Sequence, residues 1–272
     1  MTFLVTGATG SVGRAVVAEL LRGGHPVRAL TRDPGKARFP AGVEVVGGDL
    51  TRPETVAPAL EGVTGVHFIG FHGENYEPLE TAPELVALAE RAGVRRACVL
   101  QGVQGDGMLR AVTDSGLEWT SLQPVEFMSN ALDWVVPVRD EGVVREPFPS
   151  ALSAMVHEGD IGAVAATALT VPGHHKQHYI LTGPEALTKP DKVRILAEAL
   201  GREIRYEELS EQQARERWAA EGYDQETIDF FVWVHGDPPE IGYTVLPTVE
   251  QVLGRPARTF ADWSREHAGA FR

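Results

Sequence analysis

Residues 6 to 13 read Thr6-Gly7-Ala8-Thr9-Gly10-Ser11-Val12-Gly13, and this stretch decides the fold. The apolar run Phe3–Thr6 before it predicts a strand, and the periodic apolar residues after it predict a helix. Between strand and helix, Gly7 permits a tight turn, Gly10 lets the backbone approach a pyrophosphate, and Gly13 allows close helix–strand packing. The stretch therefore predicts a dinucleotide-binding turn, and a glycine-rich turn without a ligand is the alternative.

The first turn of the predicted helix supplies the groups that would hold the pyrophosphate. Backbone N–H groups at a helix N-terminus lack carbonyl partners and attract anions, which places Val12 among the binding residues. The hydroxyl groups of Thr9 and Ser11 would add further donors. We expect this turn to hold the phosphates of a nicotinamide dinucleotide.

Short β-rich runs alternate with helix-period stretches along the first half of the chain. This alternation predicts an α/β fold with a doubly wound, Rossmann-like parallel sheet and helices on both faces. The predicted strands are Phe3–Thr6, Val27–Thr31, Val43–Val46, Val66–Phe71, Ala97–Gln101 and Trp119–Leu122.

After Pro124 the alternation is less regular, and this part is expected to carry the substrate side. We expect a single domain over residues 1–272, with a dinucleotide-binding core over about 1–124 and substrate-side elements over about 125–272 that include a small C-terminal substrate-covering lobe. The pattern predicts a helix over Phe127–Trp134, a loop over Pro137–Pro149, a helix capped by Asp160 up to Thr170, a strand over Tyr179–Leu181, a helix over Lys189–Leu200, a strand over Ile204–Tyr206 and a closing helix over Phe260–Phe271.

Composition excludes several classes of function. The formal net charge of -13 would repel a phosphate backbone, so no nucleic-acid partner is expected. No apolar run approaches membrane-spanning length, so no membrane partner is expected. Cys98 is the only cysteine, which suits the reducing environment of the cytoplasm. His174, His175 and His178 lack a nearby carboxylate, so no metal site is predicted. The sequence leaves the oligomeric state open.

The ends of the later strands predict how the dinucleotide is recognised. Arg32 follows the second strand and favours NADP(H), because a guanidinium matches a 2′-phosphate, while the adjacent Asp33 leaves NAD(H) open. Asp49 and Leu50 follow the third strand and either face the adenine or form an ordinary turn. By the rule that ligands bind at the carboxyl ends of such strands, the cofactor residues also include Gly70, Phe71, Gln101 and Gly102.

Several blocks together resemble the NmrA-like branch of the atypical short-chain dehydrogenase/reductases. The blocks are Thr6–Gly13, Arg32-Asp33, Gly48-Asp49-Leu50, Ser115–Thr120 and Phe127–Asn130. The resemblance spans about the whole chain and implies that the glycine turn holds the pyrophosphate and that Arg32 selects NADP. It also implies that Pro124, Val125 and Phe127 lie near the nicotinamide.

The chain cannot supply the Tyr-x-x-x-Lys pair with which most short-chain dehydrogenases protonate a substrate oxygen. No lysine occurs between Lys36 and Lys176, and Tyr76 is the only tyrosine before Tyr179. Either the protein binds the dinucleotide without turnover, or the proton comes from water, the substrate or another side chain. By position, His72, Tyr76 and Glu126 are the candidate donors.

Two hypotheses for the function remain at this point. The first is an NADPH-dependent ketone or quinone reductase of a small cyclic or aromatic substrate, active in secondary metabolism. Its substrate pocket would include His72, Tyr76, Phe127, Met128 and Trp134, although apolar residues at helical spacing also suit a plain core. The second is a non-catalytic NAD(P)-binding redox sensor, for which the aromatic segment Tyr223–Tyr243 would be a partner interface rather than a pocket cover.

Overall fold

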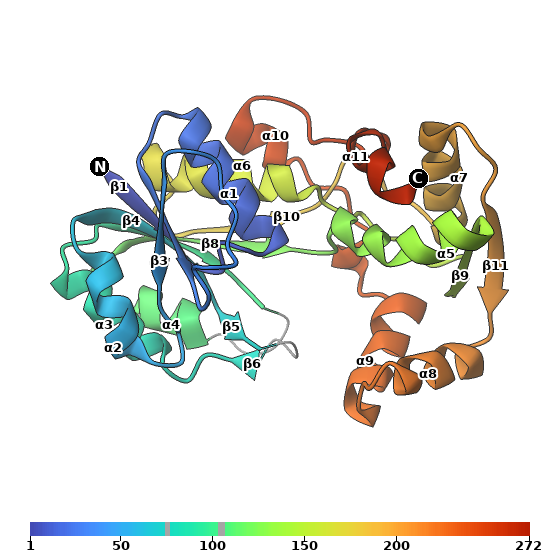
Figure 1. Ribbon diagram of the computed structural model, residues 1–272, viewed down its shortest axis with the longest axis horizontal. Helices are drawn as coiled ribbons and strands as arrows, with labels where there is room; N and C mark the ends of the chain where they lie inside the picture. The colour runs from blue at the N-terminus through green and yellow to red at the C-terminus, as the bar shows by residue number, and fades with distance from the viewer. Residues whose placement is uncertain (74–76, 103–106) are drawn as a thin grey trace. The chain divides into compact units, whose positions relative to one another are not determined.

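A computed structural model describes residues 1–73, 77–102 and 107–272 (Figure 1). The chain forms two compact units, each built from several segments. Unit 1 comprises Met1–Pro124, Glu158–Leu181 and Gln251–Gly254, and unit 2 comprises Val125–His157, Thr182–Glu250 and Arg255–Arg272. Residues 158–181, which the sequence-based division placed on the substrate side, thus belong with the first 124 residues. The single-domain interpretation stays a prediction.

Unit 1 contains a seven-stranded parallel sheet in the order β10-β8-β7-β4-β1-β2-β3. The order reverses between β1 and β4, so the turn after β1 lies at a topological switch point, where open α/β sheets bind ligands. A small antiparallel pair, β5 and β6, follows β4. The strands are β1 (Thr2–Val5), β2 (Val27–Thr31), β3 (Val43–Gly47), β4 (Val63–Ile69), β5 (Phe71–His72), β6 (Glu77–Pro78), β7 (Arg96–Leu100), β8 (Glu118–Pro124) and β10 (Gln177–Leu181).

Helices cover both faces of this sheet, as the doubly wound pattern requires (Figure 1). One face carries α1 (Ser11–Arg22) and α6 (Glu158–Thr170), and the other carries α2 (Pro53–Val56), η1 (Ala57–Leu60), α3 (Ala82–Arg91) and α4 (Gly107–Thr113). The two helices of the first face cross closely, because a Cβ added at Gly162 would lie 2.7 Å from the Ala15 Cβ. Apolar side chains of β4, β7, α3 and α4 form the core under the second face.

Unit 2 has its own core around a two-stranded parallel sheet. Its strands β9 (Val143–Pro147) and β11 (Arg205–Leu209) pair in register from Val143 with Arg205. Buried side chains such as Val144, Leu196 and Trp263 make up the main core, and a smaller core contains Trp218. The helical elements of this unit are η2 (Met128–Trp134), α5 (Val135–Glu141), α7 (Lys189–Leu200), α8 (Glu211–Ala220), α9 (Gln225–Gly236), η3 (Glu240–Gly242), α11 (Phe260–His267) and η4 (Ala268–Phe271). Helix α10 (Thr248–Leu253) is divided between the two units after Glu250.

The structure confirms the expected α/β class and corrects three local predictions. The prediction of a loop over Pro137–Pro149 is wrong, because α5 and β9 lie in this segment. Pro137 lies in the first turn of α5, where a missing N–H costs little, and Pro147 is the last residue of β9. The strand predicted over Tyr179–Leu181 belongs to the main sheet as β10 rather than to a separate lobe. Asp160 does not cap α6, which already begins at Glu158.

Candidate cofactor and active site

The turn after β1 has the geometry that its glycines predict. Gly7 adopts a positive φ of 59°, which a residue without a side chain reaches at little cost, and its carbonyl accepts a 3.0 Å hydrogen bond from the Gly10 N–H. Helix α1 then begins at Ser11 with Gly10 as its N-cap, and no side chain caps it. The amide groups of the first turn are therefore open to an anion.

The glycine positions show that this turn fits a dinucleotide. A Cβ added at Gly13 would collide with the Gly7 carbonyl oxygen and lie 2.8 Å from the Ala8 Cα, so only glycine lets the helix start so close to the strand. A Cβ added at Gly10 would meet only the Gly7 carbonyl oxygen, at 3.4 Å, and otherwise face open space. Gly13 is thus required for packing within the protein, whereas Gly10 leaves room for a phosphate.

A buried threonine, Thr6, links the two strands at the switch point. The Thr6 hydroxyl donates to the His67 carbonyl oxygen at 2.9 Å and accepts from the Ile69 N–H at 3.0 Å. These bonds join the end of β1 to the end of β4, where the two halves of the sheet diverge. The glycine turn is therefore anchored to the neighbouring strand as well as to its own.

The ends of β4 and β7 lie together, as the strand-end rule predicts. Gly70 donates to the Leu100 carbonyl at 3.1 Å, and a Cβ added at Gly102 would lie 2.9 Å from the Phe71 ring. The Gln101 N–H donates to the Leu122 carbonyl at 3.0 Å, which extends the edge to β8. The structure thus brings Gly70, Phe71, Gln101 and Gly102 to one edge, while their contacts with a cofactor stay predictions.

Arg32 and Asp33 differ in whether they have a partner. The Asp33 carboxylate lies 3.2 Å from the Lys36 ammonium, whereas Arg32 is exposed and forms no ion pair or hydrogen bond with any other residue that the structure describes. An unpaired guanidinium after the second strand suits a 2′-phosphate. The carboxylate that would bind an NAD ribose is instead paired with a lysine.

Asp49 has the contacts of a turn residue. Its Oδ1 accepts from both the N–H and the hydroxyl of Thr51, at 2.9 and 2.8 Å. Burial raises the pKa of this carboxyl, but the Thr51 hydrogen bonds and the charges of Arg52 and Arg32 outweigh it, so the pKa lies below its usual value. Leu50 is buried in the core, and its carbonyl accepts from the Thr81 hydroxyl at 2.6 Å. Adenine contacts by these two residues stay predictions.

Sequence analysis missed Arg14, which stabilises the glycine turn. Its Nε donates to the Thr9 carbonyl at 2.9 Å and its Nη1 to the Arg38 carbonyl at 2.9 Å, and its guanidinium lies over the Phe39 ring at 5.4 Å. The side chain therefore connects the turn after β1 with the loop that follows Arg32. Its position next to Gly13 was the one available signal.

The three candidate proton donors have unequal support. His72 is half-buried in β5, with Nε2 3.6 Å from Glu77 Oε2, and Tyr76 lies outside the described residues. Burial raises the pKa of Glu126, but Lys192 and other positive groups lower it further, so this carboxyl has a pKa below its usual value. An ionised carboxylate accepts protons, which argues against Glu126 as the donor.

The expected pocket residues divide between core and partly exposed positions. Met128 and Trp134 are only 2% and 8% exposed and pack in the core of unit 2, so they have little surface left for a substrate. The Trp134 Nε1 donates to Glu146 Oε1 at 3.1 Å. Phe127 is half-buried. Pro124 ends β8 and Val125 begins unit 2; their places beside the nicotinamide stay predictions.

The histidines before β10 have structural partners. The His174 Nδ1 lies 2.8 Å from the Tyr179 hydroxyl, His175 accepts from the Trp119 N–H at 3.2 Å, and His178 lies 3.1 Å from the Ser121 hydroxyl. Within residues 1–73, 77–102 and 107–272, no group of three histidine, cysteine, aspartate or glutamate side chains is arranged to hold a metal.

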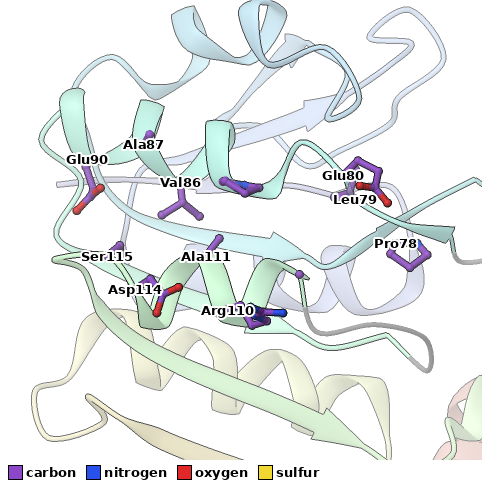
Figure 2. Close-up of a pocket in the computed structure, with 12 residues that line it drawn as sticks. Pro78, Leu79, Glu80, Val86, Ala87, Glu90, Arg110, Ala111, Asp114 and Ser115 are labelled. Carbon is purple, nitrogen blue, oxygen red and sulfur yellow. The ribbon is translucent and has the colours of Figure 1, made fainter.

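One hollow of about 440 Å³ lies apart from these residues, between α3 and α4 (Figure 2). Val86 and Glu90 line it from α3, Arg110 and Ala111 from α4, and Asp114 from just after the end of α4. It contains none of the predicted cofactor or substrate residues. In the part of the chain that the structure describes, no helix is long and apolar enough to cross a bilayer.

A glycine turn and an uncapped helix at the switch point of a parallel sheet define the nicotinamide-dinucleotide-binding α/β class. The chain belongs to the NAD(P)H-binding family, whose model matches residues 7–172, and its sequence blocks resemble the NmrA-like branch of the atypical short-chain dehydrogenase/reductases. It is an NAD(P)H-dependent oxidoreductase, because two curated relatives that it matches over 98% of their length are named as reductases.

Two curated relatives match nearly the whole chain. The (4-alkanoyl-5-oxo-2,5-dihydrofuran-3-yl)methyl phosphate reductase of Streptomyces griseus is 39% identical, and the NAD(P)H azoreductase of Xenophilus azovorans is 34% identical. Each alignment covers 98% of this chain and 98% of the relative.

Solved structures share the fold at lower identity. Citrobacter sp. triphenylmethane reductase complexed with NADP(H) has a TM-score of 0.80 at 20% identity, with 98% of this chain and 100% of that chain covered. NmrA, a negative transcriptional regulator, has a TM-score of 0.73 at 16% identity, with coverage of 97% and 94%. The recurrence of this fold in a reductase and in a regulator means that the fold alone does not decide between catalysis and sensing.

Proposed function

We propose that the protein is an NADPH-dependent reductase of a small cyclic or aromatic ketone or quinone in secondary metabolism. The observation that carries the proposal is the glycine turn, which leaves space at Gly10 for a phosphate at the switch point of the sheet. Arg32, which has no ion pair or hydrogen bond with another described residue, supports NADPH over NADH. Two relatives that match 98% of the chain are named as reductases, which supports turnover rather than binding alone.

The substrate class is supported by the relatives' names. One is named for an alkanoyl-substituted oxo-dihydrofuran that carries a methyl phosphate group, and the other for azo reduction. When bound, the nicotinamide would supply a hydride. The protein's own residues would hold the cofactor, orient the acceptor and exclude water. Because the chain lacks a Tyr-x-x-x-Lys pair, the proton would come from water or from a hydroxyl of the substrate.

The test is NADPH oxidation by the purified protein with a panel of acceptors that includes a cyclic enone, an acyl butenolide, a quinone and an azo dye. We expect turnover with at least one carbonyl or quinone acceptor and none in the Gly10→Val variant. Tight NADPH binding without oxidation of any acceptor would instead support the redox-sensor hypothesis. A cytoplasmic location and the lack of a nucleic-acid partner rest on composition and stay predictions.

A further inference from the structure

Unit 2 contains a cluster of charged side chains that the dinucleotide site does not use. We propose that Lys189, Lys192 and His235, called here the cationic cluster, bind a phosphate monoester carried by the substrate. The inference rests on the proposed function, since it names a chemical group of the substrate of that reductase. It is argued from the surroundings of each positive group.

Lys192 is the most unusual member, because a lysine ammonium is seldom buried. The residue is 4% exposed, and its Nζ donates to the Ser153 hydroxyl at 2.6 Å and lies 3.5 Å from Glu126 Oε2. Burying an ammonium is costly unless it is paired, so such a residue is retained either for a partner charge or for a ligand. Glu126 is one partner charge, and it has to serve a second lysine as well.

Lys189 precedes Lys192 by one turn of α7, and the local structure fixes both. Ser153 and Leu187 exchange backbone hydrogen bonds of 3.0 and 2.9 Å just before the helix, and Thr188 and Asp191 form a capping box at its start. Residues three apart lie on the same side of a helix. The Lys189 Nζ donates to the Pro147 carbonyl at 3.0 Å, lies over the Phe148 ring and has no carboxylate within 4.0 Å in the part of the chain that the structure describes.

Two lysines in the first turns of a helix are unfavourable without an anion. The positive end of the helix dipole repels cations, and like charges three residues apart repel each other. Burial and the charges of Lys192 and Arg217 lower the pKa of Lys189 below its usual value, against the opposite pull of Glu146 and Glu126. A bound dianion would reverse these effects, because it would pair with both ammonium groups.

His235 extends the cluster from α9. Its ring stacks on Trp218 at 6.3 Å and is half-buried, with no hydrogen bond to any residue of the described ranges. Burial lowers the pKa of His235, and the charges of Lys189 and Lys192 lower it further, against the opposite pull of Glu126 and Glu146. An unpaired imidazole beside two ammonium groups is a suitable additional donor to a phosphate.

Glu146 and Arg217 are the other charged groups that act on Lys189. Glu146 lies 3.4 Å from Arg217 and accepts from the Trp134 Nε1. Lys189, Lys192 and Arg217 thus stand against Glu126 and Glu146, which leaves a net charge of about +1 when the His235 imidazole is neutral. Such a surplus favours a compact, multiply charged oxyanion over a neutral group.

Calorimetric titration with inorganic phosphate tests the site directly. The protein is first saturated with NADP⁺, so that the cofactor's own phosphate sites are filled, and the ionic strength is held constant with chloride. We expect one saturable site that weakens at least 10-fold in Lys189→Met and in Lys192→Met, whereas Arg194→Met, on the exposed face of the same helix, leaves it unchanged. Because Glu126→Gln removes the opposing carboxylate, it should bind phosphate more tightly.

Several results would overturn the inference. They are the lack of saturable phosphate binding, an equal loss in Arg194→Met, or acetate binding as tight as phosphate. Because Lys192 is buried, thermal melts must show that Lys192→Met is folded. If Lys192→Met does not fold, Lys189→Met still tests the site, because Lys189 is only half-buried. The imidazole proton resonance of His235 gives an independent readout, because phosphate should raise the pKa of this ring in the NADP⁺-loaded protein.

A kinetic comparison separates this inference from the proposed function. Two acceptors that differ only in a hydroxymethyl or phosphomethyl group are assayed with NADPH. Lys189→Met should raise the ratio of their KM values, phosphorylated to neutral, at least 10-fold, and Arg194→Met should not change it. Turnover without this discrimination contradicts the phosphate site alone. Phosphate binding without turnover of any acceptor contradicts the proposed function alone.

Discussion

The Thr6 hydroxyl donates a 2.9 Å hydrogen bond to the carbonyl oxygen of His67, and this bond joins the two strands between which the order of the sheet reverses. Both side chains are completely buried. The Thr6 side chain has partners, but neither ring nitrogen of His67 has one among residues 1–73, 77–102 and 107–272. The strand that supports the cofactor turn therefore carries an unpaired polar ring in the interior of unit 1.

His67 should make the stability of the protein fall in mild acid. Burial lowers the pKa of His67 from 6.5 to about 4, so the folded state resists protonation that the unfolded chain accepts. Stability should be constant above pH 6.5, fall between pH 6.5 and about 4 by roughly 3 kcal/mol from this group, and then level off. Urea unfolding of His67→Leu should show a shallower loss over that interval; an identical loss in parent and variant would contradict the assignment.

Gly10→Val should abolish dinucleotide binding and leave the fold intact. Gly10 has extended backbone angles, φ -75° and ψ 171°, which valine adopts readily, and its added side chain would enter the space left for the pyrophosphate. NADPH affinity and a thermal melt measure the two effects. Gly13→Val is the contrasting variant: its side chain would overlap the Gly7 carbonyl, so it should lose stability as well. Unchanged NADPH affinity in Gly10→Val would refute the site.

Arg32→Ala should narrow the preference for NADPH over NADH by roughly 1–3 kcal/mol, through loss of a charge-assisted bond to the 2′-phosphate. Kd values for both cofactors give the difference. Arg22→Ala is the control, since Arg22 pairs with Glu19 on α1 and should leave the preference unchanged. Equal affinities of the parent protein for both cofactors would show that Arg32 does not select NADP.

No single side chain among the three candidates should be indispensable as proton donor. A general acid contributes roughly 10²–10⁴-fold, so His72→Ala, Tyr76→Phe and Glu126→Gln should each lower kcat by less than that. Substrates with a hydroxyl beside the reacting carbonyl should react faster than those without, because their own hydrogen bond stabilises the developing alkoxide. A loss of about 10³-fold in one variant, with unchanged NADPH affinity, would identify a protein acid.

The sequence predicted the sheet well because its strands are short apolar runs between glycines and polar turns. Val27–Thr31 matches β2 in full, and Lys189–Leu200 matches α7. Pro137 misled the prediction of the next segment, since proline breaks helices in their interior but not in their first turn. Local pattern also could not place Tyr179–Leu181, because strand neighbours are set by contacts between residues far apart in the chain.

For the candidate site, sequence spacing identified the glycine turn. It did not identify side chains whose roles depend on contacts with residues distant in the sequence. Arg14 looks like an ordinary helix residue until its bonds to the Thr9 and Arg38 carbonyls are seen. Lys189 and Lys192 resemble surface lysines, because nothing local shows that Glu126 and Ser153 surround the second of them. Burial of a charge arises from segments that are distant in sequence.

The interleaving of the two units has a consequence for domain exchange among relatives. The chain passes between them at residues 124/125, 157/158, 181/182, 250/251 and 254/255. A fragment that stops at Pro124 would lack β10 and leave β8 as a bare edge, open to pairing with other chains. Recombination at one crossover point therefore exchanges neither unit intact. A chimera that exchanges unit 2 must replace 125–157, 182–250 and 255–272 as a set.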